Sequence, residues 1–242
     1  MNKIRTPAFS QTAKGRLFGE VLKQLQEANA YYSFRAVSQR VKELGLKISA
    51  GTLRVYLSEA MASGLIHDAG RGWYSRLSDP VPLDPKPVAK LIRAVEKLFP
   101  LLDFTCWSTA QINPWMHHLL AQPVAFLHAP TDTLESVGDT LRAQGWEVTV
   151  NPPPSAGPRS VRPGEKMVVL RPTLSKQPRS HGRQDSAEKL LVDLVAESQR
   201  LALMDVPEAE GVAREVLSRH LLQIAEMQSY AKFRKLKSAV FE

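Results

Sequence analysis

The spacing of apolar residues over the first 64 positions predicts three short helices. Apolar residues recur at helical intervals within residues 14–29, again within 34–44 and again within 50–63. Ser33 and Ser49 stand directly before the second and third segments, where serine is a favoured N-cap. Because so few residues separate the last two helices, the pattern is typical of a helix-turn-helix.

A β-hairpin is predicted directly after the third helix. Residues 65–68 and 73–77 are short segments with apolar side chains, and a glycine-flanked turn carrying Arg71 separates them. Packed against the three helices, this hairpin would be a wing with a cation at its tip. We therefore predict a winged helix-turn-helix domain over residues 1–78.

The pattern changes after residues 79–87, a stretch that contains four prolines. Proline at this density excludes a helix or a central strand, so we interpret the stretch as a linker. Residues 88–242 then alternate between strand and helix, which is typical of an α/β domain. The expected fold class is α/β, or α+β over the whole chain, with a small mixed sheet and two C-terminal helices in the second domain.

The second domain is expected to contain the following elements. Helices are predicted at 88–99, 112–122, 131–143, 187–204 and 208–237, and strands at 103–107, 124–129, 146–151 and 166–171. The polar segment 172–186 is expected to be a mobile loop. Cys106 and Trp107 lie in an apolar strand, so we expect both to be buried.

The charge is concentrated in the N-terminal third of the chain. The net charge is +8, and residues 1–76 hold twelve Lys and Arg against five Asp and Glu. The remaining 166 residues are nearly balanced, with 20 against 19. Since net charge bears on partners rather than on fold, this asymmetry favours an anionic partner for the first domain.

Cysteine content and hydropathy bear on the cellular location. A single cysteine excludes an intramolecular disulfide and a cysteine-based zinc cluster formed by this chain alone. The basic N-terminus lacks the apolar run of a signal peptide, and no segment approaches the ~18 apolar residues of a membrane span. We therefore expect a cytoplasmic protein without membrane contact.

The third helix and the hairpin together predict an interface for double-stranded DNA. Arg54, on the outer side of the helix, would bind guanine in the major groove. Arg71 would enter the minor groove or hold a phosphate. The full set of predicted DNA-binding residues is Arg35, Gln39, Arg40, Lys47, Ser49, Thr52, Arg54, Val55, Ser58 and Arg71. The alternative is a winged helix that binds another protein, with these charges simply solvated.

The sequence lacks the common catalytic motifs, among them the P-loop, the nucleophile elbow and the zinc-protease helix. We therefore expect neither an enzyme nor a bound cofactor or metal ion. His117 and His118 are adjacent, so on a helix they diverge and cannot share one metal ion. Together with His128 they are expected at the surface or at its boundary.

Two other functions stay open. A metal-dependent nuclease would use Asp132, Glu147 and Lys166, which all lie near strand ends, although no lysine stands two residues after Glu147. A transcription factor could instead sense a small molecule with its second domain. Six basic residues are expected to be solvated on polar loops or to contact an anionic partner: Arg159, Arg162, Arg171, Lys176, Arg179 and Arg183.

Two groups of residues resemble the bacterial type IV toxin-antitoxin antitoxins of the AbiEi class. The first is the winged-helix run from Tyr32 to Tyr74, which ends in GRGWY. The second is CWSTAQIN at 106–113, followed by VNP at 150–152. The resemblance implies a repressor that binds inverted repeats in its own promoter and, in phage defence, counteracts a neighbouring nucleotidyltransferase-like toxin without a stable complex. Such a repressor would act as a monomer or a weak homodimer.

Overall fold

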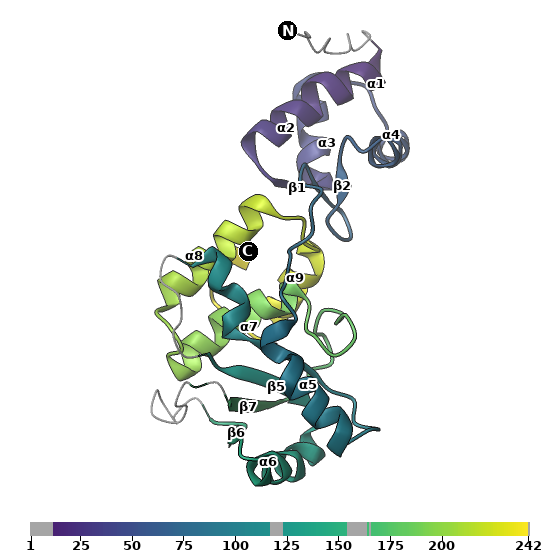
Figure 1. Ribbon diagram of the computed structural model, residues 1–242. Coiled ribbons are helices and arrows are strands. Elements are labelled where there is room, and N and C mark those ends of the chain that lie inside the picture. The colour runs from purple at the N-terminus through teal and green to yellow at the C-terminus, as the bar shows by residue number, and fades with distance from the viewer. Residues whose placement is uncertain (1–11, 117–122, 154–163, 165, 242) are drawn as a thin grey trace, which may run out of the picture. The chain divides into compact units, whose positions relative to one another are not determined.

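The computed structural model describes residues 12–116, 123–153, 164 and 166–241, and the chain folds into two compact units (Figure 1). Unit 1 consists of Met1–Pro80 and Leu217–Ala225, and unit 2 consists of Val81–Val216 and Glu226–Glu242. The first boundary falls within the predicted linker. The segment Leu217–Ala225 belongs to unit 1, whereas the prediction assigned the whole of 88–242 to one domain.

Unit 1 is a winged helix, as the sequence predicts. Its elements are α1 (Ala13–Arg16), the π-helical turn η1 (Leu17–Leu22), α2 (Lys23–Ala28), β1 (Tyr31–Ser33), α3 (Phe34–Glu43), α4 (Ala50–Ala62), β2 (His67–Asp68) and β3 (Trp73–Ser75). The sheet is antiparallel in the order β1-β3-β2. Strand β1 was not predicted, because three residues are too short to show an alternating pattern.

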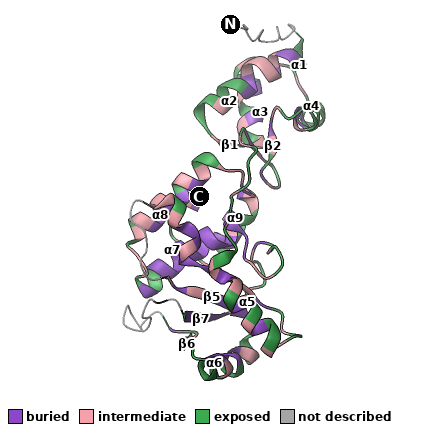
Figure 2. Ribbon diagram, in the orientation of Figure 1, coloured by how far each residue is buried: buried purple, intermediate pink, exposed green. Residues whose placement is uncertain are grey.

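The helices of unit 1 begin where their caps predict. The Ser33 hydroxyl accepts the Ala36 amide at 3.2 Å, and the Ser49 hydroxyl accepts the Thr52 amide at 3.1 Å. Figure 2 colours buried stretches of the ribbon purple, and buried residues of η1, β1, α3 and α4, with Ile66, form one apolar core. Its buried members are Leu17, Val21, Leu22, Tyr32, Val37, Val41, Leu53, Leu57, Ala60 and Ile66.

The segment Leu217–Ala225 is held against the first strand and the end of unit 1. The Tyr31 hydroxyl donates to the His220 carbonyl and accepts the Leu222 amide at 3.0 Å. The Leu221 amide donates to the Asp79 carbonyl at 2.7 Å. These bonds take up backbone groups that a continuous helix would use. The predicted helix 208–237 is therefore divided into two.

Unit 2 contains a small mixed sheet, as predicted. Its elements are α5 (Lys86–Leu98), β4 (Thr105–Ser108), the 3-10 helix η2 (Thr109–Trp115), β5 (Ala125–Ala129), η3 (Thr131–Thr133), α6 (Leu134–Ala143), β6 (Glu147–Val150), β7 (Met167–Pro172), α7 (Ala187–Leu201), α8 (Val206–Arg219), α9 (Ile224–Phe233) and η6 (Ala239–Phe241). The last residues of α8 and the first two of α9 belong to unit 1. The sheet order is β4-β5-β7-β6, with β5, β7 and β6 parallel and β4 antiparallel at the edge.

The two faces of this sheet have different chemistry. Leu127 of β5 and Leu170 of β7 pack into an apolar core with α5 and α6. Because successive side chains of a strand point to opposite faces, His128 and Arg171 point to the other face, where they contact α7. Charged residues are therefore buried between the sheet and α7.

The segment 172–186 of unit 2 differs from its prediction. The segment 172–186 was expected to be mobile, but it is tied to β4: the Cys106 amide donates to the Arg183 carbonyl at 2.8 Å, and the Asp185 amide donates to the Cys106 carbonyl at 2.9 Å. Its polar composition concealed these contacts, because they are made by the backbone.

His117, His118, Arg159 and Arg162 lie outside the described residues. Within the part of the chain that is described, no helix has the length and apolar character needed to cross a bilayer.

Candidate functional site

The outer face of α4 is formed mainly by small side chains. Leu53, Leu57 and Ala60 point into the core, whereas Thr52, Val55 and Ser58 are exposed. Val55 is 55% exposed, which is unusual for a branched apolar residue. Small polar and apolar side chains allow a helix backbone to come close to a groove of DNA, and a valine methyl group can contact thymine.

Two exposed arginines lie next to this face. The guanidinium of Arg54 lies 4.9 Å from the centre of the Phe34 ring, and the Phe34 amide donates to the Gly72 carbonyl at 2.8 Å. Gly72 directly follows Arg71, so Phe34 links α4 to the hairpin tip. Gly70 and Gly72 have φ of +93° and +76°, which only glycine adopts without strain. Phe34 thus contacts Arg54 through its ring and the backbone beside Arg71 through its amide.

The remaining predicted DNA-binding residues fall into two classes. Arg35 and Lys47 are exposed, and in the described part of the chain neither has an ion-pair partner. Arg40 instead donates to Glu43 at 2.9 Å and to Gln24 at 2.8 Å, and Gln39 donates to Glu43 at 3.0 Å. Hydrogen bonds from Arg40 and Gln39 lower the pKa of the Glu43 carboxyl. Gln39 and Arg40 would have to leave this carboxylate before they bind a phosphate.

Ser49 and Thr52 have a structural role at the start of α4. Besides capping the helix, the Ser49 hydroxyl lies 2.9 Å from the Thr52 hydroxyl. Both side chains are exposed, at the end of the helix where its backbone amides and dipole favour an anion. A phosphate near this end would therefore meet two hydroxyl groups.

The residues of the nuclease alternative do not come together. Glu147 begins β6, and Lys166 directly precedes β7, so both lie at the amino ends of parallel strands. Asp132 lies in η3, which follows the carboxyl end of β5. The length of the strands therefore separates Asp132 from the other two residues. All three residues lie near strand ends, as predicted, but at opposite ends of the parallel strands, so the trio forms no joint site.

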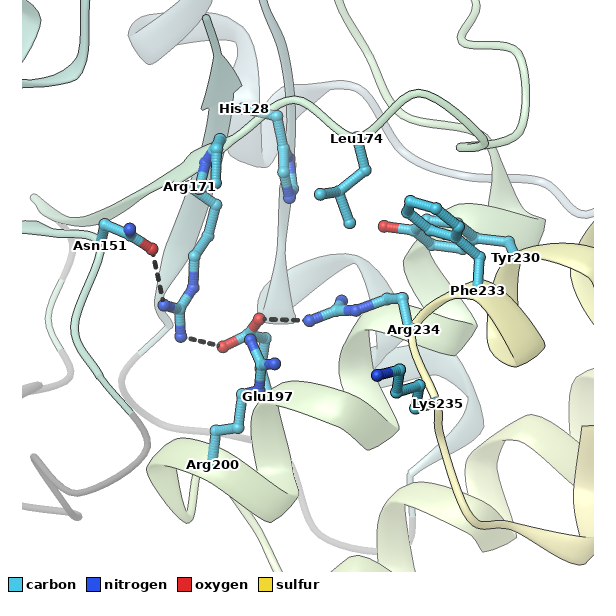
Figure 3. Close-up of a pocket in the computed structure, with 11 residues that line it drawn as sticks. His128, Asn151, Arg171, Leu174, Glu197, Arg200, Tyr230, Phe233, Arg234 and Lys235 are labelled. Atoms are coloured by element: carbon cyan, nitrogen blue, oxygen red, sulfur yellow. Dashed lines mark hydrogen bonds and ion pairs between the residues drawn. The ribbon is translucent and has the colours of Figure 1, made fainter. Parts of the chain in front are cut away.

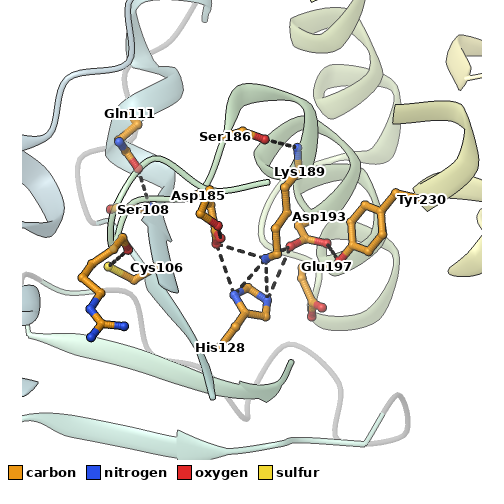
Figure 4. A network of polar contacts seen from close by, with 12 residues as sticks. Cys106, Ser108, Gln111, His128, Asp185, Ser186, Lys189, Asp193, Glu197 and Tyr230 are labelled. Atoms are coloured by element: carbon orange, nitrogen blue, oxygen red, sulfur yellow. Dashed lines mark hydrogen bonds and ion pairs between the residues drawn. The ribbon is translucent and has the colours of Figure 1, made fainter. Parts of the chain in front are cut away.

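A buried charged network lies between the sheet and α7 (Figure 4). Its charged members are Arg171, Asp185, Lys189, Asp193, Glu197 and Arg234, and His128 and Tyr230 complete it. The Lys189 ammonium lies 3.0 Å from Asp185 and 2.7 Å from Asp193, and it also contacts the His128 ring at 2.9 Å. A lysine thus occupies the centre of an acidic and histidine-containing cluster.

The network controls the ionisation of its carboxyl groups. Burial alone would raise the pKa of Asp185, but the Lys189 ammonium and His128 outweigh burial and hold that pKa at about 2. The pKa of Asp193 is also well below its ordinary value, because Lys189 and Arg234 outweigh the effect of burial. Burial and the neighbouring Asp193 raise the pKa of Tyr230. Both carboxyl groups are therefore ionised at neutral pH.

A pocket opens beside this network (Figure 3). Its volume is about 210 Å³, and it is lined by His128, Asn151, Arg171, Pro172, Leu174, Glu197, Arg200, Tyr230, Phe233, Arg234 and Lys235. Four of these side chains are cationic, and Glu197 is the one acidic residue in the lining. Glu197 is already bound by Arg171 at 2.5 Å and by Arg234 at 2.9 Å. We call this site the cationic pocket.

The sequence did not indicate the network or the pocket. His128 was expected at the surface and Arg171 on a solvated loop, but they are 3% and 5% exposed. Asp185 directly precedes the N-cap of α7, and Lys189, Asp193 and Glu197 follow at intervals of four, which is also the pattern of a solvated helix face. The available signal is that every position between Lys189 and Glu197, apart from Asp193, is apolar.

A comparison with known protein families assigns the chain to one of them. The sequence model of a family of unknown function, DUF6577, matches residues 52–242. The chain belongs to this family. No curated protein and no solved structure matches it.

The DUF6577 match covers the candidate site in unit 2 completely and the one in unit 1 in part. It begins at Thr52 on the outer face of α4 and includes the hairpin, the charged network and every residue that lines the cationic pocket, whereas α3 and Ser49 lie before it. Within this range, CWSTAQIN forms β4 and most of η2. Trp107 stacks on Phe126 with ring centres 4.5 Å apart, and Ser108 and Gln111 form a capping box. Cys106 and Trp107 are fully buried, as expected, so this motif supports the fold of unit 2.

Proposed function

We propose that unit 1 binds double-stranded DNA with α4 and the hairpin tip, and that the chain is a transcription regulator. The observation that carries this proposal is the link that Phe34 makes between α4 and the hairpin tip: the exposed Arg54 stacks on its ring, and its amide bonds to Gly72, the residue after the exposed Arg71. The charge of residues 1–76 supports it, because phosphate contacts supply much of the affinity for DNA.

The test is binding to the DNA upstream of the gene, measured by fluorescence anisotropy. We expect Arg54→Ala to weaken binding by about 1 to 3 kcal/mol and to relax the base preference at one position. Arg71→Ala should weaken binding to all sequences and reduce the salt dependence by about one phosphate contact. Lys23→Ala is the matched control, because Lys23 is a cation of the same unit on α2, paired with Glu27.

Wild-type affinity in both arginine variants at ~0.15 M salt would contradict the proposed interface. A wild-type protein that shows no preference for its upstream DNA over unrelated DNA would instead favour the alternative in which the winged helix binds a protein. Circular dichroism of each variant checks that the fold is kept.

The resemblance to AbiEi-class antitoxins supports a more specific proposal. The regulator would repress its own operon through inverted repeats and counteract a nucleotidyltransferase-like toxin from the same operon. Co-expression of the full chain with the product of the adjacent gene should restore growth. The full chain is needed because Leu217–Ala225 belongs to unit 1 and a fragment of residues 88–242 would separate that segment from its partners. Failure to restore growth would contradict the antitoxin role and leave DNA binding to its own test.

A ligand-responsive regulator is the second candidate, and the cationic pocket is the observation that favours it. A sensing domain needs a cavity in which polar groups converge, and the pocket of unit 2 has this character. If this candidate holds, a compound that binds unit 2 will change the affinity of the chain for its upstream DNA. Equal DNA affinity with and without bound compound would exclude it.

A further inference from the structure

The cationic pocket contains more positive charge than its own surroundings neutralise. Within the charged network, Arg171, Lys189 and Arg234 face Asp185, Asp193 and Glu197, so the formal charges cancel. Arg200 and Lys235 also line the pocket, and in the described part of the chain neither makes an ion pair or side-chain hydrogen bond. The charged network and the pocket lining together therefore have two cations in excess.

Arg200 lies among charges of both signs. Burial and the neighbouring Arg234 and Arg171 lower the pKa of its guanidinium, and they outweigh Glu197 and Asp193, which raise it. A bound anion would favour the charged form of this guanidinium. This electrostatic effect adds to the position of Arg200 in the pocket lining.

Arg171 provides a buried donor without a partner. Its side chain is 6% exposed, and its terminal nitrogens bond to Glu197, to the Pro152 carbonyl at 2.7 Å and to Asn151 at 3.2 Å. Its Nε atom is buried and has no hydrogen-bond partner in the described structure. An unpaired buried donor costs about 1 to 3 kcal/mol. The buried guanidinium beside the pocket is therefore incompletely satisfied, but its Nε is not accessible to a ligand.

Backbone strain is concentrated at the same place. Among the described residues, three that are not glycine have positive φ: Asn151, Ala202 and Lys235. Asn151 and Lys235 line the pocket, and Ala202 follows Arg200 by two residues. Such conformations cost about 1 to 3 kcal/mol each and cluster at ligand sites, where the surrounding structure maintains them.

The apolar part of the lining indicates which chemical group of a ligand would be joined to the anion. Tyr230, Phe233 and Leu174 form an apolar part of the wall, and Phe233 is 40% exposed. Lys176 lies 5.9 Å from the centre of the Phe233 ring. Aromatic and cationic side chains in one pocket suit a ligand that joins a flat ring to a phosphate.

We propose that the cationic pocket of unit 2 binds a small phosphomonoester, with its phosphate held by Arg200 and Lys235 and its ring against Phe233. The two excess cations match the charge of a phosphomonoester, about −1.5 to −2 at neutral pH. This inference goes beyond the DNA-binding function and does not depend on it.

The test is isothermal titration calorimetry of the full chain, without DNA, against adenosine monophosphate, adenosine and inorganic phosphate. We expect adenosine monophosphate to bind most tightly, inorganic phosphate more weakly and adenosine at least tenfold more weakly. Arg200→Ala and Lys235→Ala should each reduce the affinity for adenosine monophosphate about tenfold, which corresponds to roughly 1.4 kcal/mol. Both residues are exposed, so these variants should keep the fold.

The matched control is Arg93→Ala, which removes an exposed arginine of unit 2 that bonds only to the Ala89 carbonyl of its own helix. It should bind adenosine monophosphate as the wild type does. Phe233→Leu should weaken adenosine monophosphate but not inorganic phosphate, because it removes the ring and leaves the cations. The proposal is overturned if adenosine binds as tightly as its phosphate, or if Arg200→Ala and Lys235→Ala bind as the wild type does.

Discussion

Lys189 shows how much a single side chain can determine in this fold. Its side chain is fully buried, and its ammonium lies within 3.0 Å of two carboxylates and contacts the His128 ring. Moving a charge out of water costs several kcal/mol, so a lysine is tolerated here only because acidic partners meet it at short distance. Removing one member of such a cluster leaves the others unpaired. The arrangement therefore makes the packing of α7 on the sheet specific.

The ionisation of Asp185 predicts how unit 2 responds to acid. In the folded chain its pKa falls from an ordinary 3.8 to about 2. A lowered pKa adds stability that is complete above pH 4 and is lost as the pH falls toward 2. For Asp185 the loss is roughly 2 kcal/mol, at about 1.4 kcal/mol for each pKa unit. Urea unfolding followed by circular dichroism between pH 7 and pH 2 measures it.

Two variants distinguish the loss of stability caused by protonation of Asp185 from the loss caused by protonation of the other carboxyl groups. Asp185→Asn should be less stable at pH 7 and should lose less stability between pH 4 and pH 2 than the wild type. Asp139→Asn should keep the wild-type slope, because Asp139 is 75% exposed and pairs with Arg142 at the surface. Equal slopes for the wild type and Asp185→Asn would show that the network does not set the acid response.

At the scale of elements, α6 lies close enough to β6 to restrict a glycine. A Cβ atom at Gly138 would lie 2.8 Å from a methyl carbon of Val150, a distance that side chains do not tolerate. Gly211 in α8 has nothing within 4 Å of the same position. Glycine is unfavourable in both helices, so only packing distinguishes the two sites.

Replacing each glycine by alanine should therefore have opposite effects. Gly138→Ala should destabilise the protein by about 1 to 3 kcal/mol, because the helix or the strand must move to admit the methyl group. Gly211→Ala should stabilise it by about 0.5 to 1 kcal/mol through helix propensity alone. Thermal unfolding of the two variants beside the wild type measures both. A stabilised Gly138→Ala would mean that α6 is packed less closely on β6.

The elements also show what could be read from the sequence and what could not. The helices of unit 1, its hairpin and the strands of unit 2 follow local patterns, so their positions were predicted to within a few residues. The division between α8 and α9 depends on Tyr31, which is almost 190 positions away and leaves no local signal. The exposed face of α4, which we propose as the DNA interface, was predicted from helical spacing alone, because Leu53, Leu57 and Ala60 fall on the opposite, buried face. The cationic pocket was missed because its arginines resemble solvated loop residues until the strands are assembled.

At the scale of the whole molecule, unit 1 is built from two distant segments of chain. Leu222 and Ile224 are buried, and Gly70 of the hairpin lies close to Ala225, where an added Cβ would come within 2.9 Å of the alanine Cβ. The Gln223 side chain also donates to the Asp68 carbonyl at 3.4 Å. The hairpin thus depends on residues that lie more than 140 positions further along the chain.

Cutting the chain after Pro80 should therefore loosen the hairpin more than the helical core. In a fragment of residues 1–80, β1 and the hairpin lose the segment Leu217–Ala225, while the apolar cluster around Leu17 and Leu57 is kept. Hydrogen exchange should show faster exchange in the fragment than in the full chain at the amides of Ala69 and Trp73, which bond within the hairpin. Amides in the middle of α3 serve as the internal reference. Equal protection of the hairpin in the fragment and in the full chain would mean that the segment Leu217–Ala225 does not support the hairpin.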